Sequence, residues 1–175
     1  MGGDVTLRSS ITRGYDVRQV LLAATVLLVA SSVSAADLGR AEGALTIDKD
    51  RIGLGYAYAI GHQRNDTTKR KDETKVILTD KALPQDANLD EIEATIPDNT
   101  YAMIFNIAPN GKVTHVAVLH PKGSYDAGFL EDMPDYRFKN AGGSRGIVAG
   151  KISSGRIQTN TMAFTVDADF NAAVK

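Results

Sequence analysis

Residues 100–120, TYAMIFNIAPNGKVTHVAVLH, decide the fold class of this chain. Two runs that alternate in the β sense flank Pro109-Asn110-Gly111. Asn-Gly between alternating runs is the strongest short-range signal for a β-hairpin. Five more runs of strand character accompany this hairpin, and all are short and separated by polar or glycine-containing segments. They are residues 43–48, 53–60, 74–80, 146–153 and 162–170.

One segment departs from this pattern. Residues 84–94 place Leu89 and Ile92 at helix-like spacing behind acidic residues, and Pro97 ends the run. We therefore predict a mainly β domain, an antiparallel β-sandwich or partly open barrel of about seven strands with one short inserted helix. The polar residues 62–73 are expected to form an exposed loop, and residues 125–140 an irregular acidic segment.

The first 35 residues indicate where the protein is located rather than how it folds. Three arginines precede an apolar run at residues 20–30, and small residues follow at 31–36. A basic region, a short apolar run and a small-x-small motif are the marks of a secretory signal peptide. We predict cleavage after Ala35 or Ala36, a single domain over residues 36–175, and a periplasmic or extracellular location. The alternative is an uncleaved anchor, although the run is shorter than the ~20 apolar residues of a membrane span.

Composition excludes several classes of function. The chain has no cysteine, so an exported domain would lack disulfides, thiolate metal sites and a cysteine nucleophile. The whole chain has a net charge of −1, and its first 35 residues hold three arginines and two aspartates, which leaves −2 for the remainder. No basic field is present to bind nucleic acid. After signal cleavage we expect no stable membrane span.

Two motifs give the chain a resemblance to a known family. The first is Tyr56-Ala57-Tyr58-Ala59, and the second is Leu78-Thr79-Asp80-Lys81-Ala82-Leu83-Pro84. In their order along the chain they resemble a family of small exported bacterial β-rich proteins of unknown function. The resemblance implies the fold and the exported location over nearly all of residues 36–175. It implies no activity and no catalytic residues.

Histidine is the side chain whose ordinary pKa suits acid–base chemistry near neutral pH, and the chain has three, His62, His115 and His120. The last two are five residues apart in one predicted strand. An odd spacing places them on opposite faces of the sheet, so they cannot hold one metal ion together unless the strand bulges or ends early. We predict no metal site and no cofactor.

Catalytic candidates come from His120 and the acidic segment that follows it. Asp126 and Asp135 are the carboxylates that could lie within hydrogen-bond reach of His120 in a cleft. The chain has no Gly-x-Ser-x-Gly, Ser-x-x-Lys or His-Glu-x-x-His motif and no twelve-residue calcium loop.

Ligand-binding candidates are aromatic and cationic. Tyr56 and Tyr58 share one face of a predicted strand, with Leu54 and Ile60, and Tyr125 lies downstream. Tyrosine rings can line the mouth of a pocket with their hydroxyls at the wet end. Arg145, in a glycine-rich turn, could bind an anion.

These observations leave two hypotheses. The first is an exported, non-enzymatic domain that binds a small molecule, an envelope component or another protein. The alternative is a small hydrolase or metal-dependent enzyme, with a site near His120 and the 125–140 segment. A hollow without convergent ionisable groups would favour the first, and a histidine–carboxylate pair in a cleft would favour the second.

Overall fold

The computed structural model describes residues 36–65, 70–121, 123–130, 132–142 and 144–175. The predicted signal segment, residues 1–35, lies outside the described residues. In the described part of the chain, ten strands form one antiparallel sheet with a single short helix, α1 (Ile92–Thr95). No helix within these ranges is long and apolar enough to span a membrane. The strands are β1 (Arg40–Ile47), β2 (Asp50–Asn65), β3 (Arg70–Thr79), β4 (Ala102–Ile107), β5 (Val113–His120), β6 (Gly123–Phe129), β7 (Tyr136–Asn140), β8 (Ile147–Ser154), β9 (Ile157–Gln158) and β10 (Ala163–Ala173).

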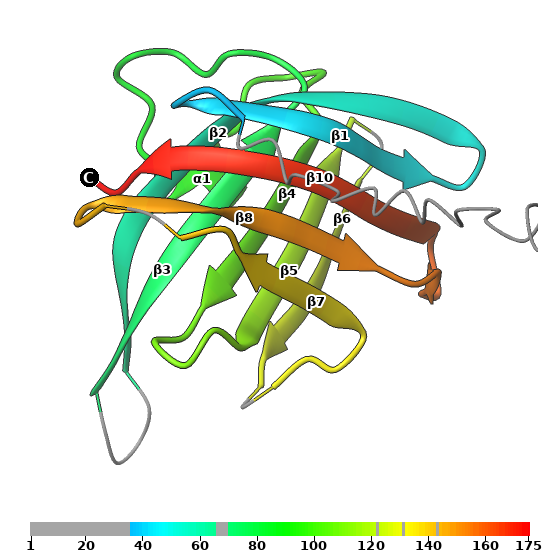
Figure 1. The fold of residues 1–175 in the computed structure, drawn as a ribbon. Coiled ribbons are helices and arrows are strands. Elements are labelled where there is room, and N and C mark those ends of the chain that lie inside the picture. The colour runs from blue at the N-terminus through cyan, green and yellow to red at the C-terminus, as the bar shows by residue number, and fades with distance from the viewer. Residues whose placement is uncertain (1–35, 66–69, 122, 131, 143) are drawn as a thin grey trace, which may run out of the picture. The chain divides into compact units, whose positions relative to one another are not determined.

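The sheet curls into a half-barrel (Figure 1). Its strand order is β6-β5-β4-β3-β2-β1-β10-β8-β7, and β9 pairs with β10 off this path. The two edge strands, β6 and β7, follow each other in the chain, so the connection between them bridges the open side. Its backbone bonds to β5, because the amides of Leu130 and Met133 donate to the carbonyls of Thr114 and Val113 at 2.8 and 2.9 Å.

The main core fills the concave side of the sheet. Alternate residues of β10 point inward, among them Phe164, Val166 and Phe170, all about 1% exposed. The ring of Phe170 meets that of Phe105 edge-on at 5.5 Å and stacks with that of Phe138 at 5.9 Å. Because one ring comes from β4 and the other two from β10 and β7, they join the two halves of the curled sheet.

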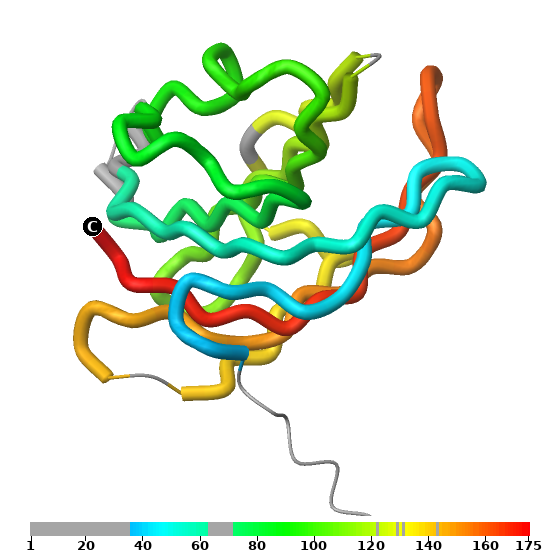
Figure 2. The backbone as a smooth tube through the Cα atoms, turned by 90° about the horizontal axis from the view of Figure 1, so that it is seen from above, coloured from blue at the N-terminus to red at the C-terminus, as the bar shows by residue number. Residues whose placement is uncertain are grey.

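A second apolar layer lies on the convex side. The segment between β3 and β4 carries α1 and crosses this face (Figure 2). Leu83, Leu89 and Ile92 from the segment pack against outward-facing Ile77 and Ile104. The segment is further held by the Tyr58 hydroxyl, which accepts a hydrogen bond from the Leu83 amide at 2.8 Å. The helix predicted over residues 84–94 therefore lies in this region, but it is shortened to four residues.

The prediction of a mainly β fold with one short helix is confirmed, but the predicted number of strands is wrong. The seven expected strands are present, and β6, β7 and β9 are additional. β6 and β7 are edge strands with one neighbour each, so they need fewer apolar side chains and give a weak alternation. Residues 62–73 were expected to be an exposed loop. Instead His62 pairs with Glu73, and the β2–β3 ladder continues to Asn65 and Arg70.

The faces of β2 also differ from the expected alternation. Leu54 packs into the concave core together with Ala57 and Ala59, whereas Tyr58 and Ile60 face the convex layer. Leu54 and Ala57 are three residues apart, so the alternation reverses between them. A register shift in the β1–β2 ladder, between Arg40 and Gly43, accompanies this reversal.

Candidate functional site

A hollow of about 660 Å³ lies at one open end of the half-barrel, where side chains from both halves of the sheet meet. It opens directly onto the main core. The mouths of β-barrels are among the preferred places for small-molecule sites, and the volume falls in the usual range for such sites. Its apolar wall consists of Ile107, Phe138, Ile147, Val148 and Val174, and its polar rim includes Asp72 and Asn140.

Phe138 owes its place in this wall to a glycine on the neighbouring strand. A Cβ atom at Gly150 would lie 2.5 Å from Cε2 of Phe138 and 2.5 Å from the Lys139 carbonyl oxygen. The absence of a side chain at Gly150 lets the Phe138 ring lie flat on β8 and stack with Phe170. The ring remains half-buried, so one of its faces contributes apolar surface to the hollow.

A second feature is a group of buried polar residues on the convex face, beside the apolar layer under α1. Lys75, Asn106 and His115 lie side by side across β3, β4 and β5. Asn106 donates through Nδ2 to Oε2 of Glu73 at 3.1 Å. Lys75 donates to the Asp90 carbonyl oxygen at 3.0 Å. All four of these strand side chains are buried, so polar groups occupy positions where the neighbouring rows are apolar.

Two β-bulges direct His115 and Asp126 toward each other. On β5 the register with β4 shifts so that Thr114 is an extra residue, which turns His115 to the convex face while Val113 and Val116 both face the core. On β6 the shift against β5 falls between Asp126 and Phe129, where Gly128 has a φ of 67°. Bulges of this kind re-aim side chains and occur often beside functional sites.

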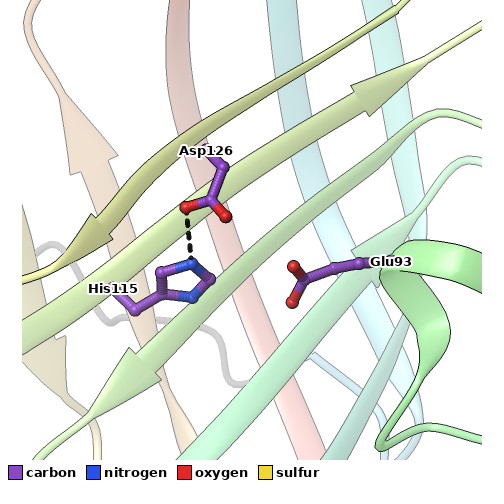
Figure 3. Close-up of side chains that lie close together, drawn as sticks. All are labelled: Glu93, His115 and Asp126. Atoms are coloured by element: carbon purple, nitrogen blue, oxygen red, sulfur yellow. Dashed lines mark hydrogen bonds and ion pairs between the residues drawn. The ribbon is translucent and has the colours of Figure 1, made fainter.

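The resulting pair has a defined geometry. Nε2 of His115 lies 3.0 Å from Oδ1 of Asp126, and the same oxygen accepts a hydrogen bond from the Gly128 amide at 2.6 Å. Because an ionised carboxylate only accepts, Nε2 carries the proton in this arrangement. The His115 side chain is 2% exposed, and that of Asp126 is 58% exposed. Glu93 of α1 directs its carboxylate toward the same space (Figure 3).

His62 lies close to this group, and the charges of the group change its pKa. Partial burial lowers the pKa of His62 below its ordinary value, and the positive charge of Lys75 lowers it further. The carboxylates of Glu73 and Asp90 act in the opposite direction. His62 therefore favours its neutral form more strongly than an exposed histidine does.

The catalytic candidates predicted from the sequence are not brought together. Asp126 pairs across from Ala117, and His120 pairs across from Gly123, three positions along the same ladder. That offset is about 10 Å, and it places the two side chains on opposite faces of the sheet. Asp135 lines one hollow with Arg137 and the end of β8, whereas His120 lines another with residues 96–100.

The ligand-binding candidates are also dispersed. The Tyr56 ring lies 4.8 Å from the Arg40 guanidinium carbon, and Tyr58 holds the convex segment through its hydroxyl. Tyr125 points into the core, where its ring lies 5.3 Å from that of Phe164. Arg145 is exposed in the turn before β8. None of these four residues lines the hollow at the open end.

The polar residues that do lie together can be seen in the sequence only as polar positions within apolar runs. Asn106 and His115 are polar residues at positions where the flanking run is apolar, as in AMIFNIA and VTHVAVL. Such interruptions could have marked the group. Glu93 and Phe138 gave no signal, because one lies on a surface helix and the other on an edge strand. Comparison with protein-family models, curated proteins and solved structures found no match.

Proposed function

We propose that this chain is an exported, non-enzymatic binding domain that holds a small, largely apolar molecule in the hollow at the open end of its half-barrel. The observation that carries the proposal is the hollow itself, whose wall joins side chains from β4, β7 and β8. Phe138, Ile147, Val148 and Val174 each keep part of their apolar surface in contact with solvent. Covering that surface with an apolar ligand removes it from water, which is favourable by roughly 25 cal/mol per Å².

The polar groups at the rim give the ligand an orientation. Asn140 offers an amide, and Asp72, exposed on the other side, offers a carboxylate. An apolar wall with a few polar groups is the usual composition of small-molecule sites. A ligand with an apolar body and one hydroxyl or amine group matches this arrangement. The exported location rests on the basic, apolar and small-residue pattern of residues 1–36.

Titration of the purified protein with N-phenyl-1-naphthylamine, a neutral fluorescent apolar probe, tests the proposal. We expect saturable binding with one probe per chain. Val148→Asp and Val174→Asp place a charge in the hollow and should weaken binding by about tenfold or more, since a charge that loses water without a partner is costly. Leu38→Asp changes an exposed leucine outside the hollow and should leave binding unchanged.

Circular dichroism of each variant separates loss of binding from loss of folding. A wild-type protein that shows no saturable binding contradicts the proposal, and so does an equal loss in Leu38→Asp. The location is tested separately by mass spectrometry of the protein recovered from the host's envelope fraction. An N-terminus at residue 36 or 37 supports export, and an intact N-terminus in the cytoplasmic fraction contradicts it.

A further inference from the structure

We propose that Glu93, His115 and Asp126 form a binding site for a divalent first-row transition metal ion, with Zn²⁺ as its probe. One ligand atom from each of the three side chains lies within 4.8 Å of the other two. The three come from α1, β5 and β6, so the sheet and the segment that covers it converge there (Figure 3). This site is separate from the hollow at the open end and does not depend on the function proposed for it.

The donor set defines the class of ion. One imidazole nitrogen and two carboxylate oxygens suit Zn²⁺, Mn²⁺ or Fe²⁺, and no thiolate is present to favour softer ions. For ligands about 2.1 Å from an ion at tetrahedral angles, neighbouring ligand atoms are about 3.4 Å apart. The separation of 3.0 Å between Nε2 of His115 and Oδ1 of Asp126 needs to widen only slightly. When the ion binds, the neutral imidazole carries its one proton on Nδ1, which leaves the Nε2 lone pair for the ion.

The surrounding charges favour a cation. The charges of Glu73, Lys75, Asp90 and His115 all act on the pKa of His62, so His62, Glu73, Lys75 and Asp90 lie around the trio. With neutral histidines, the four carboxylates of the group outnumber its one ammonium. Nζ of Lys75 lies 3.8 Å from Oε1 of Glu93 and balances one of these negative charges. The net negative charge that remains attracts a divalent cation.

Asn106 supplies an independent observation. It is fully buried, directly across from His115 in the β4–β5 ladder, and its Oδ1 has no hydrogen-bond partner among the described residues. Its Nδ2 donates to Glu73 on the β3 side. In a planar amide the oxygen points away from the nitrogen, which turns Oδ1 toward the β5 side, where His115 lies. A buried acceptor without a donor is destabilising, and an ion or its bound water removes that cost.

Titration of the purified protein with Zn²⁺ after treatment with a chelator tests the site. We expect one ion per chain, and a loss of affinity of tenfold or more in both Glu93→Gln and Asp126→Asn. These substitutions keep the size of exposed or half-exposed side chains, so the fold should persist, as circular dichroism will show. Asp98→Asn removes the same charge from an exposed position outside the trio and is the matched control.

The identity of the nitrogen ligand has its own readout. The chain contains three histidines, so imidazole ¹H–¹⁵N spectra contain three ring systems, assigned with His62→Gln and His120→Gln. Zn²⁺ should shift the signals of His115 and leave those of His120 in place. Mn²⁺ should broaden the same signals through its unpaired electrons. Three results overturn the proposal: no stoichiometric binding, an equal loss of affinity in Asp98→Asn, or a shift at His120 in place of His115.

Discussion

Gly43→Ala should be one of the most destabilising small substitutions in this protein. Gly43 lies in β1, opposite Ala168 of β10, with a φ of 152°. A Cβ atom there would lie 2.2 Å from the carbonyl oxygen of Asp167 and 2.5 Å from Cα of Ala168. Both are backbone atoms, so no side-chain rotation relieves the overlap. The two strands must instead separate by about 1 Å, which takes adjacent ladder hydrogen bonds out of their normal range of distances.

The expected loss in the free energy of unfolding is the sum of three contributions. Two weakened backbone hydrogen bonds cost about 1–3 kcal/mol in the free energy of unfolding. An alanine held at an unfavourable positive φ costs about 1–2 kcal/mol more. Alanine also restricts the unfolded chain, which returns about 0.4–1 kcal/mol. The net loss is about 3 kcal/mol, and for a domain of about 140 residues that lowers the melting temperature by about 10 °C.

Gly53→Ala is the matched control, because Gly53 lies in the neighbouring strand β2, opposite Ala44. No heavy atom lies within 4 Å of a Cβ atom built there, and its φ is not in the positive range. Since both substitutions change the unfolded chain equally, their difference isolates the folded state. Differential scanning calorimetry of both variants measures it. Melting temperatures within about 2 °C of each other would refute the close approach of β1 and β10 at Gly43.

Two further predictions concern ionisable groups. The Tyr136 hydroxyl is buried without a hydrogen-bond partner among the described residues, and burial raises its pKa. Tyr136→Phe should therefore raise the free energy of unfolding by about 1 kcal/mol in urea titrations, with an unchanged m-value. A loss of stability would show that the hydroxyl has a partner. The pKa of His62 is lowered from 6.5 by partial burial and by Lys75. The unfolded chain therefore takes up this proton first, and the free energy of unfolding falls as the pH drops below 6.5. In His62→Gln that fall should be smaller between about pH 7.5 and 5.5, and an unchanged slope would contradict the assignment.

The fold class was predictable from the sequence because its central hairpin is locally determined. Gly111 adopts a φ of 81° in the turn, and the Asn110 side chain accepts a hydrogen bond from the Lys112 amide at 3.0 Å. β4 is buried along its whole length, as an apolar run between two neighbours requires. The edge strands were not predicted because they are not locally determined. β6 contains glycine, serine and aspartate, and its place in the sheet is set by pairing with β5 rather than by its own alternation.

The candidate site was less predictable, because it depends on breaks in regular geometry. The odd spacing of His115 and His120 places them on opposite faces of the sheet, and the register agrees with that separation. The spacing does not show which face His115 takes, because the extra residue Thr114 in β5 decides it. The partner of Asp126 depended likewise on the bulge at Gly128. A bulge changes the face of every later residue in its strand, and no local composition signals it reliably.

The buried polar group on the convex face is itself an argument for a role beyond stability. Lys75 and Glu73 are each about 5% exposed, and Asn106 is fully buried. Along the same face, Ile77, Ile104 and Ala117 fill the neighbouring positions of β3, β4 and β5 with apolar side chains. Replacing buried charged groups by well-packed apolar residues is often neutral or stabilising, so packing alone does not favour charges here. The two bulges and the α1 segment instead bring the most polar part of this face next to Glu93 and Asp126, which is the arrangement that cation binding needs.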